Sequence, residues 1–185
     1  EDEKEVGVAM VEIGAQTTNV AAYYEGKIHH VAILPFGGAT LTQDLMRGLA
    51  VPYKEAQRAK EHHAHAFAQM VDPRETVDLP GPSPNQMRSV ACELIAHIVE
   101  QRLDEMFGII QGELQDHGAL DKLGAGIVLS GGTAAIPGIV ELAQQIFAAP
   151  VRLGVPAEGL SGIADVVARP RFTVGAGLAL WGADR

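Results

Sequence analysis

An apolar run that ends in a turn of small residues constrains the fold of this chain more than any other feature. The run Val6–Ile13 is compatible with a buried β-strand, and Thr18–Tyr24 is rich in residues that favour strands. Gly14–Thr18 must then connect these strands, and Glu25-Gly26 supplies a second tight turn into the apolar segment 27–35. The sequence therefore predicts a three-stranded antiparallel meander.

The turn Gly14–Thr18 has a composition suited to an anion. Successive backbone N–H groups in such a turn can face one point, and small side chains let an anion approach closely. Glu12 would place a carboxylate beside the turn, where it suits a magnesium ion or the waters of that ion. An ordinary β-meander, in which small residues only satisfy turn geometry, is the alternative for this segment taken alone.

A second glycine turn follows another continuous apolar strand later in the chain. The strand 125–129 runs into Ser130–Thr133, and Pro137 suits the first turn of a following helix, because no N–H partner is needed there. A strand, a glycine turn and a helix N-terminus together let a ligand rest against bare backbone. An ordinary tight turn is again the alternative, but two such turns in one chain favour a ligand site.

The two turns also carry a family resemblance. EIGAQTTNVAAYYEGKI resembles the second phosphate motif of the actin-like ATPase superfamily, and GIVLSGGTAAIPG resembles its adenosine motif. Three further stretches narrow the resemblance to the FtsA family of bacterial cell-division proteins. They are HHVAILPFGGATLTQDLMRGLAVPYKEAQRAKEHH, ETVDLPG and VRLGVPAEGLSGIADVVARPRFTVGAGLALWG. Together these stretches cover nearly all of residues 6–182.

The resemblance implies an α/β fold: an actin-like (RNase H-like) sheet with flanking helices and an inserted helical/β subdomain. Proteins of this superfamily grip a nucleotide between two lobes, and the first phosphate loop belongs to the first lobe. Since nothing before Glu12 matches that loop, the chain is expected to be the second lobe alone. Residues 1–38 and 121–185 would form its core subdomain, and 39–120 the inserted small subdomain.

The spacing of apolar residues predicts helices and strands that agree with this division into subdomains. Helices are predicted at 39–49 and 53–69, a short strand at 75–80, and a long helix from Asn85 that ends at Gly118. At about 1.5 Å per residue, a helix of about thirty residues would span roughly 45 Å and could join the two subdomains. The remaining strand, helix, strand and helix would return to the first sheet.

Site residues follow from the resemblance by position. The residues implied are Gly14, Ala15, Gln16, Thr17 and Thr18 for phosphate, Gly131, Gly132 and Thr133 for adenosine, Gln57 and Lys60 for ribose and base, and Glu12 for magnesium, held indirectly. No catalytic residue is assigned.

Five positions depart from the family pattern. Glu12 replaces an Asp, Ala15-Gln16 replaces Gly-Gly, Asn19 replaces a frequent Asp, and Gln57 replaces a frequent Glu. ATP and Mg²⁺ are therefore expected to bind the full-length protein, with at most weak hydrolysis. This chain alone is expected to bind neither and to have no enzymatic activity. A degenerate pocket in a retained fold is the alternative.

Composition excludes several classes of protein. The 14 basic against 23 acidic residues argue against a nucleic-acid surface, which needs clustered Lys and Arg. No apolar run is long enough to span a bilayer, and no basic start precedes a secretory core. Cys92 is the single cysteine, which excludes an internal disulfide and fits a reducing compartment. We expect it to be a small packing residue on a helix.

Histidines raise the question of a metal site. His62, His63 and His65 cluster, and His29-His30 occur earlier, but the chain has no Cys pair and no His-Glu-x-x-His pattern. Solvated or helix-end histidines are therefore favoured over a zinc site. Ser130 lacks the Gly-x-Ser-x-Gly elbow of a hydrolase nucleophile.

Three function classes stay open. A protein similar to FtsA would bind the C-terminal tail of FtsZ through the inserted region, about 50–120, and polymerise into actin-like filaments. It would lie in the cytoplasm on the inner face of the membrane at the division site, held by a C-terminal helix that this sequence does not include. The Gly14-Ala15 turn also resembles PilM, a pilus-assembly scaffold. A sugar kinase of the same superfamily is the third class.

Overall fold

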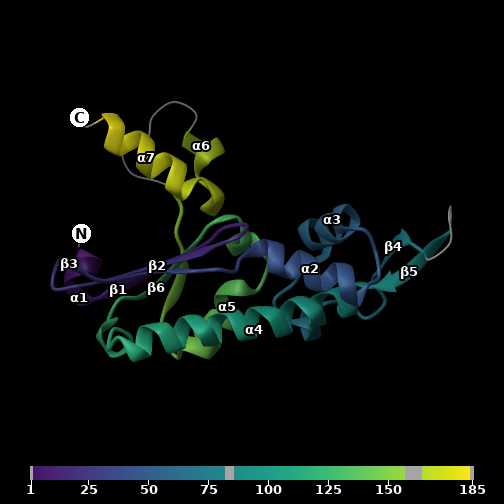
Figure 1. Cartoon of the computed structure of the whole chain (residues 1–185), viewed down its shortest axis with the longest axis horizontal. Coiled ribbons are helices and arrows are strands. Elements are labelled where there is room, and N and C mark those ends of the chain that lie inside the picture. Colours follow the sequence, from purple (N-terminus) through teal and green to yellow (C-terminus); the bar gives the residue numbers. More distant parts are fainter. Residues whose placement is uncertain (1, 82–85, 157–163, 184–185) are drawn as a thin grey trace.

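A computed structural model describes residues 2–81, 86–156 and 164–183 of the 185-residue chain. A five-stranded sheet occupies one end of the molecule, and a two-stranded sheet lies at the other end (Figure 1). A long helix runs beneath the five-stranded sheet and leads directly from the two-stranded sheet (Figure 1).

The five-stranded sheet is built from two separate parts of the chain. Its strands are β1 (Val8–Ile13), β2 (Thr18–Tyr24), β3 (Lys27–Leu34), β6 (Gly126–Ser130) and β7 (Val151–Leu153), in the order β3-β2-β1-β6-β7. The first three strands pair antiparallel, which confirms the predicted meander, and β6 lies parallel to both β1 and β7. Glu25 and Gly26 have φ values of 53° and 71°, as a tight two-residue hairpin turn requires.

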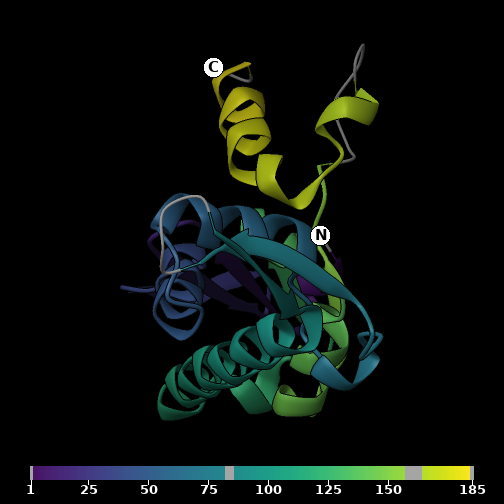
Figure 2. The same ribbon diagram turned by 90° about the vertical axis from the view of Figure 1, so that its right-hand side faces the viewer.

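Burial alternates along β1 because one face of the sheet packs on helices. Ala9, Val11 and Ile13 are buried, and every residue of β6 is buried. Two helices cover this face, α4 (Cys92–Asp116) and α5 (Ile139–Phe147), as Figures 1 and 2 show from perpendicular directions. The shared core explains why such short strands are stable in this arrangement.

The far end of the molecule holds two helices and a hairpin. They are α2 (Gly38–Gly48), α3 (Tyr53–His63), β4 (Thr76–Pro80) and β5 (Met87–Ala91). The predicted short strand at 75–80 is confirmed. The strands of the large sheet come from 8–34 and 126–153, as the predicted division into a core and an inserted subdomain requires. Helix α4 contacts elements of both parts, so the exact boundaries between the two subdomains stay a prediction.

Two predicted helices have different bounds. The long helix begins at Cys92, because Met87–Ala91 pairs with β4 and this pairing overrides a helix-like spacing of apolar residues. The predicted start, Asn85, lies outside the described residues. The helix predicted at 53–69 ends at His63, since Ala64 is extended and the N–H of Ala66 donates to the carbonyl of Pro137 over 2.9 Å.

Two other helix ends test the sequence reasoning. Gly118, with φ of 63°, follows the end of α4 as predicted. The prediction for Pro137 was wrong: a 3₁₀ turn occupies Gly132–Ala135, and α5 begins only after Gly138, whose φ is 79°. A left-handed residue at Gly138 turns the chain before the helix can start.

The remaining elements lie at the periphery. The charged N-terminal residues form a short exposed helix, α1 (Asp2–Val6). Helices α6 (Ala164–Val167) and α7 (Thr173–Ala183) lie on the side of the molecule away from α4 (Figures 1 and 2). Further 3₁₀ turns are Ala68–Met70, Leu120–Lys122 and Pro170–Phe172. Among the described residues, no helix has both the length and the apolar character to cross a membrane.

Candidate functional site

Both glycine turns open onto one cleft of about 820 Å³, which we call the glycine cleft. The turn after β1, the start of α2, one side of α3, the turn after β6 and the segment before α7 surround it. Its lining residues are Gly14, Ala15, Gly38, Ala39, Tyr53, Gln57, Lys60, Glu61, His62, Ala64, Gly132, Thr133, Ala135, Ile136, Pro137, Arg169 and Arg171.

Backbone hydrogen bonds fix the first turn against α2. The N–H of Gly14 donates to the carbonyl of Thr17 over 2.9 Å and closes the turn. The N–H groups of Gly38 and Ala39, at the start of α2, donate to the carbonyls of Gly14 and Ala15 over 2.9 and 2.7 Å. These bonds satisfy two donors that a helix N-terminus leaves free, so the turn and the helix start form one rigid unit.

The second turn is bound to the first. The hydroxyl of Thr133 donates to the carbonyl of Gly14 over 3.2 Å. Gly131 has φ of 88°, and a Cβ atom there would lie 2.3 Å from the carbonyl oxygen of Ile13. Only glycine allows this close approach, so the two turns form adjacent walls of one cleft.

Lys60 on α3 supplies a positive charge to the cleft. Its Nζ donates to the carbonyl of Gly38 over 2.8 Å and to the hydroxyl of Thr42 over 2.9 Å. That hydroxyl donates to Oε1 of Gln57 over 2.7 Å, and Nε2 of Gln57 donates to Glu61 over 2.6 Å. Burial lowers the pKa of Lys60, although the charge of Glu61 opposes this effect. The network holds Lys60 and Gln57 in fixed positions on one wall.

The structure brings together only some of the residues that the resemblance implied. Gly14, Ala15, Gln57, Lys60, Gly132 and Thr133 line the cleft.

The other implied residues lie elsewhere. Gln16 and Thr17 are exposed at the tip of the turn. Thr18 is fully buried, and its hydroxyl donates to the carbonyl of Phe36 over 2.9 Å, which gives it a structural role. Gly131 is buried and does not line the glycine cleft. Glu12 accepts a hydrogen bond of 2.7 Å from the amide of Asn19, its partner across the β1–β2 pair.

Two arginines in the cleft were missed by the sequence reasoning. Arg169 and Arg171 flank Pro170, whose carbonyl accepts a hydrogen bond of 3.1 Å from the N–H of Gly131. With Lys60 they give the cleft three cationic side chains, which suits a polyphosphate. The signal was the Arg-Pro-Arg sequence in a stretch that already carried the resemblance.

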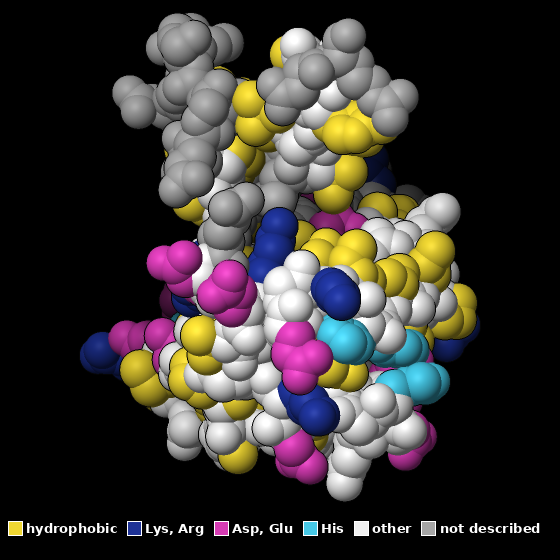
Figure 3. Space-filling model, turned by 90° about the vertical axis from the view of Figure 1, so that its left-hand side faces the viewer, with side chains coloured by type: hydrophobic (Ala, Val, Ile, Leu, Met, Phe, Trp, Pro, Cys, Tyr) yellow, Lys and Arg dark blue, Asp and Glu magenta, His cyan; other side chains and the backbone are white. Residues whose placement is uncertain are grey.

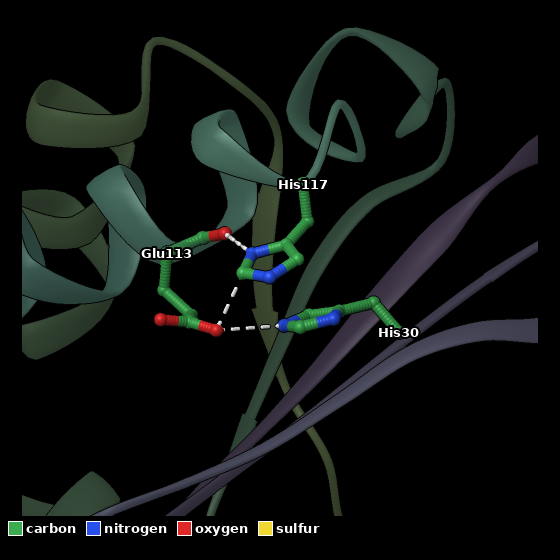
Figure 4. Close-up of side chains that lie close together, drawn as sticks. All are labelled: His30, Glu113 and His117. Atoms are coloured by element: carbon green, nitrogen blue, oxygen red, sulfur yellow. Dashed lines mark hydrogen bonds and ion pairs between the residues drawn. The ribbon is translucent and has the colours of Figure 1, made fainter.

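The histidines gather into groups that the sequence did not predict. His65, two residues after the end of α3, accepts a hydrogen bond from the N–H of Phe67 over 3.0 Å. His30 on β3 and His117 after α4 meet at Glu113, where His30 Nε2 lies 2.9 Å from the carboxylate (Figure 4). Histidine side chains are visible on this end of the molecule among charged residues (Figure 3). His63 belongs to a second group with Glu75 and Cys92.

Ser130 lies beside the second turn but has no nucleophile geometry. It is fully buried, and its hydroxyl has no hydrogen-bond partner in the part of the chain that the structure describes. No acid–base partner therefore activates it within the described residues.

Comparison with solved structures identifies the fold. The chain is similar to MreB 5 of Spiroplasma citri bound to AMPPNP, with a TM-score of 0.74 and 16% identity, covering 96% of this chain and 53% of that chain. It is also similar to a chain of the PilM-PilN type IV pilus biogenesis complex, with a TM-score of 0.70 and 17% identity, covering 98% and 47%. The fold is actin-like.

Sequence comparison identifies the family. The family model described as "Cell division protein FtsA" matches residues 9–177. The cell division protein FtsA of Pseudomonas aeruginosa is 41% identical over 185 residues, which are 100% of this chain and 44% of that relative. The chain belongs to the FtsA family, as the motifs predicted, and it spans less than half the length of this relative.

Proposed function

We propose that this chain is the lobe of an FtsA-type cell-division adaptor that binds the C-terminal tail of FtsZ. The proposal rests on membership of the FtsA family and on one structural observation. A hollow of about 540 Å³, which we call the hairpin hollow, lies between α3 and the β4–β5 hairpin, within the region predicted to carry the peptide site.

The lining of the hairpin hollow has the composition of a peptide groove. Val77, Leu79 and Met87 supply apolar surface, and the Met87 side chain is 59% exposed. Glu55, Arg58 and Asp78 add charged side chains to the lining, and Arg58 on α3 can donate hydrogen bonds to a peptide carboxylate. Apolar anchors inside a polar rim are typical of sites that bind short peptides.

The glycine cleft supports the second part of the proposal. We propose that it supplies one wall of an ATP·Mg²⁺ site, with Gln57 and Lys60 facing the ribose and base, Arg169 and Arg171 facing the phosphates, and the opposite wall contributed by the other lobe. When residues of one lobe alone contact a triphosphate, its other side stays exposed to water. This chain alone should therefore bind ATP weakly or not at all. The whole protein would hydrolyse ATP weakly at most, because Glu12, Ala15-Gln16 and Asn19 depart from the phosphate motif of the superfamily.

Assembly and location complete the proposal. FtsA-type filaments would form by self-association of the whole protein, and a C-terminal amphipathic helix would hold it on the inner face of the membrane at the division site.

A labelled FtsZ tail peptide tests the central claim. Fluorescence anisotropy should rise on addition of the chain, and Arg58→Glu should weaken binding by about tenfold, because it reverses a charge in the hollow. Arg47→Glu makes the same change of charge at an exposed position on α2 outside the hollow, and should bind like the unmodified chain. No anisotropy change at high micromolar protein would overturn the proposal.

A further inference from the structure

Three metal-ligating side chains from separate segments meet at the start of α4. His63 is the last residue of α3, Glu75 precedes β4, and Cys92 is the first residue of α4. Cys92 Sγ lies 3.7 Å from His63 Nδ1, and Glu75 Oε1 lies 4.0 Å from the same nitrogen. All three donor atoms lie within 4.8 Å of one another.

The backbone holds two of these residues in register. The N–H of Cys92 donates to the carbonyl of Glu75 over 2.9 Å, and the N–H of Glu75 donates to the carbonyl of Asp72 over 2.9 Å. Cys92 is only 1% exposed, so its side chain has little freedom. The Cys92 sulfur is therefore positioned by the fold before any ligand arrives, which lowers the entropic cost of binding, whereas the Glu75 side chain is 56% exposed and is ordered by the metal.

We propose that His63, Glu75 and Cys92 form a binding site for a Zn²⁺ ion. Zinc takes thiolate sulfur at about 2.3 Å and imidazole nitrogen or carboxylate oxygen at about 2.0–2.2 Å, in tetrahedral geometry. Those bond lengths place neighbouring donor atoms roughly 3.3–3.6 Å apart. The sulfur–nitrogen separation needs to shorten by about 0.2 Å and the nitrogen–oxygen separation by about 0.6 Å, and rotation of the half-exposed Glu75 side chain supplies the larger change.

The donor set selects the metal. Thiolate and imidazole are ligands that zinc accepts and that Mg²⁺ and Ca²⁺ avoid. Three protein ligands leave a fourth coordination position, and His63 also lines the hairpin hollow, so this position opens toward solvent. A water molecule or a carboxylate from a bound peptide could occupy it.

Proton balance accompanies binding. Burial and the nearby Glu75 raise the pKa of the Cys92 thiol, so the metal-free site holds a protonated thiol. When Zn²⁺ forms its bond to sulfur, the S–H bond breaks and one proton leaves to solvent, while His63 binds as the neutral imidazole.

The other histidine cluster is less suited to a metal. The rings of His30 and His117 stack with centroids 3.9 Å apart and planes 20° apart (Figure 4). The in-plane lone pairs of stacked rings run side by side and do not converge on one ion. His117 Nδ1 also lies 2.8 Å from the backbone carbonyl of Glu113, so this nitrogen already has a partner.

Metal titration tests the site directly, with a readout that does not involve FtsZ or ATP. The purified protein is stripped with a chelator and titrated with Zn²⁺ by calorimetry and with Co²⁺ by absorption. We expect one ion per chain with a dissociation constant below about 10 µM. A near-ultraviolet cobalt–thiolate band and release of one proton should accompany binding.

Variants assign the ligands. Cys92→Ser should remove the cobalt–thiolate band and weaken Zn²⁺ binding by at least about tenfold, and His63→Ala should weaken binding similarly. His62→Ala removes the neighbouring imidazole, which is not part of the cluster, and should leave affinity unchanged; His117→Ala should do the same.

A second measurement covers the case in which Cys92→Ser fails to fold. In the unmodified protein, Zn²⁺ should slow alkylation of the single thiol, and the His63→Ala variant should lose this protection. The proposal is overturned if Zn²⁺ binds no tighter than about 10 µM, if no thiolate band develops, or if alkylation is unaffected.

Discussion

Lys60 Nζ donates to the carbonyl oxygen of Gly38 over 2.8 Å, so α3 is bound to the first residue of α2 at the mouth of the glycine cleft. The same carbonyl belongs to the helix start whose N–H groups hold the Gly14 turn. Lys60 thus stabilises the backbone that shapes the glycine cleft and also contributes a positive charge to it.

Replacing Lys60 with Met should therefore have two effects. The Gly38 carbonyl and the Thr42 hydroxyl, both in buried residues, lose a charged donor, which should lower the free energy of unfolding by about 1–2 kcal/mol in urea titrations. In the full-length protein, ATP affinity should fall by about tenfold. Lys54→Met, at an exposed position on the same helix, is the control and should change neither quantity.

The isolated lobe gives a complementary result for ATP. Because one wall of the cleft cannot enclose a triphosphate, the unmodified 185-residue chain should show little heat of binding in calorimetry with ATP·Mg²⁺. Sub-micromolar affinity of the chain alone would contradict the proposed half-site.

Gly131→Ala should be among the most destabilising single changes in the chain. The φ of 88° disfavours any side chain, and the new Cβ would lie 2.3 Å from the carbonyl oxygen of Ile13. We expect a loss of about 3 kcal/mol or more in thermal or urea unfolding. Gly132→Ala is the matched control, since a Cβ at Gly132 meets no atom within 4 Å. Equal stability of the two variants would show that the turns do not approach as described.

Sequence reasoning found the sheet and both glycine turns because those features are local. Strand periodicity and turn chemistry suffice for Val6–Gly26. It failed where distant segments decide the outcome. Met87–Ala91 has a helical spacing of apolar residues, yet pairing with β4 makes it a strand.

Side-chain contacts between distant segments were missed for the same reason. Cys92 was expected to be only a packing residue, because nothing in the linear sequence shows that His63 and Glu75 lie beside its sulfur. Thr18 was assigned to phosphate by its place in a motif, whereas its hydroxyl serves the carbonyl of Phe36. A motif gives the position of a residue along the chain, and only the fold decides which way its side chain points.

Ser130→Ala should stabilise the protein. The buried hydroxyl of Ser130 lacks a hydrogen-bond partner among the described residues, so removing it relieves a desolvation cost of about 1 kcal/mol. Thr18→Val removes a hydroxyl that is equally buried but bonded to Phe36, and should instead cost about 1 kcal/mol. Urea denaturation of both variants measures this contrast, and destabilisation by Ser130→Ala would contradict it.

The raised pKa of Cys92 predicts a pH dependence of stability in metal-free protein. A thiol whose pKa is higher in the folded than in the unfolded state keeps its proton longer when folded. Its contribution to stability is therefore complete below the ordinary thiol pKa of 9.0 and declines as pH rises from there toward the folded pKa. The unfolding free energy of the unmodified protein, compared with Cys92→Ala, should fall over this alkaline range and stay level at neutral pH.

The contact between His30 and Glu113 should connect the edge strand β3 to the end of α4. Both side chains are partly buried, and the 2.9 Å distance between His30 Nε2 and the carboxylate is that of a good hydrogen bond. A double-mutant cycle with His30→Ala and Glu113→Ala should give a coupling energy of about 0.5–1.5 kcal/mol. His29→Ala, which removes a ring stacked on Tyr24, should show no coupling to Glu113→Ala. If the coupling of His30 were equally small, β3 would be held by the sheet alone, and the cluster would contribute nothing to the docking of α4.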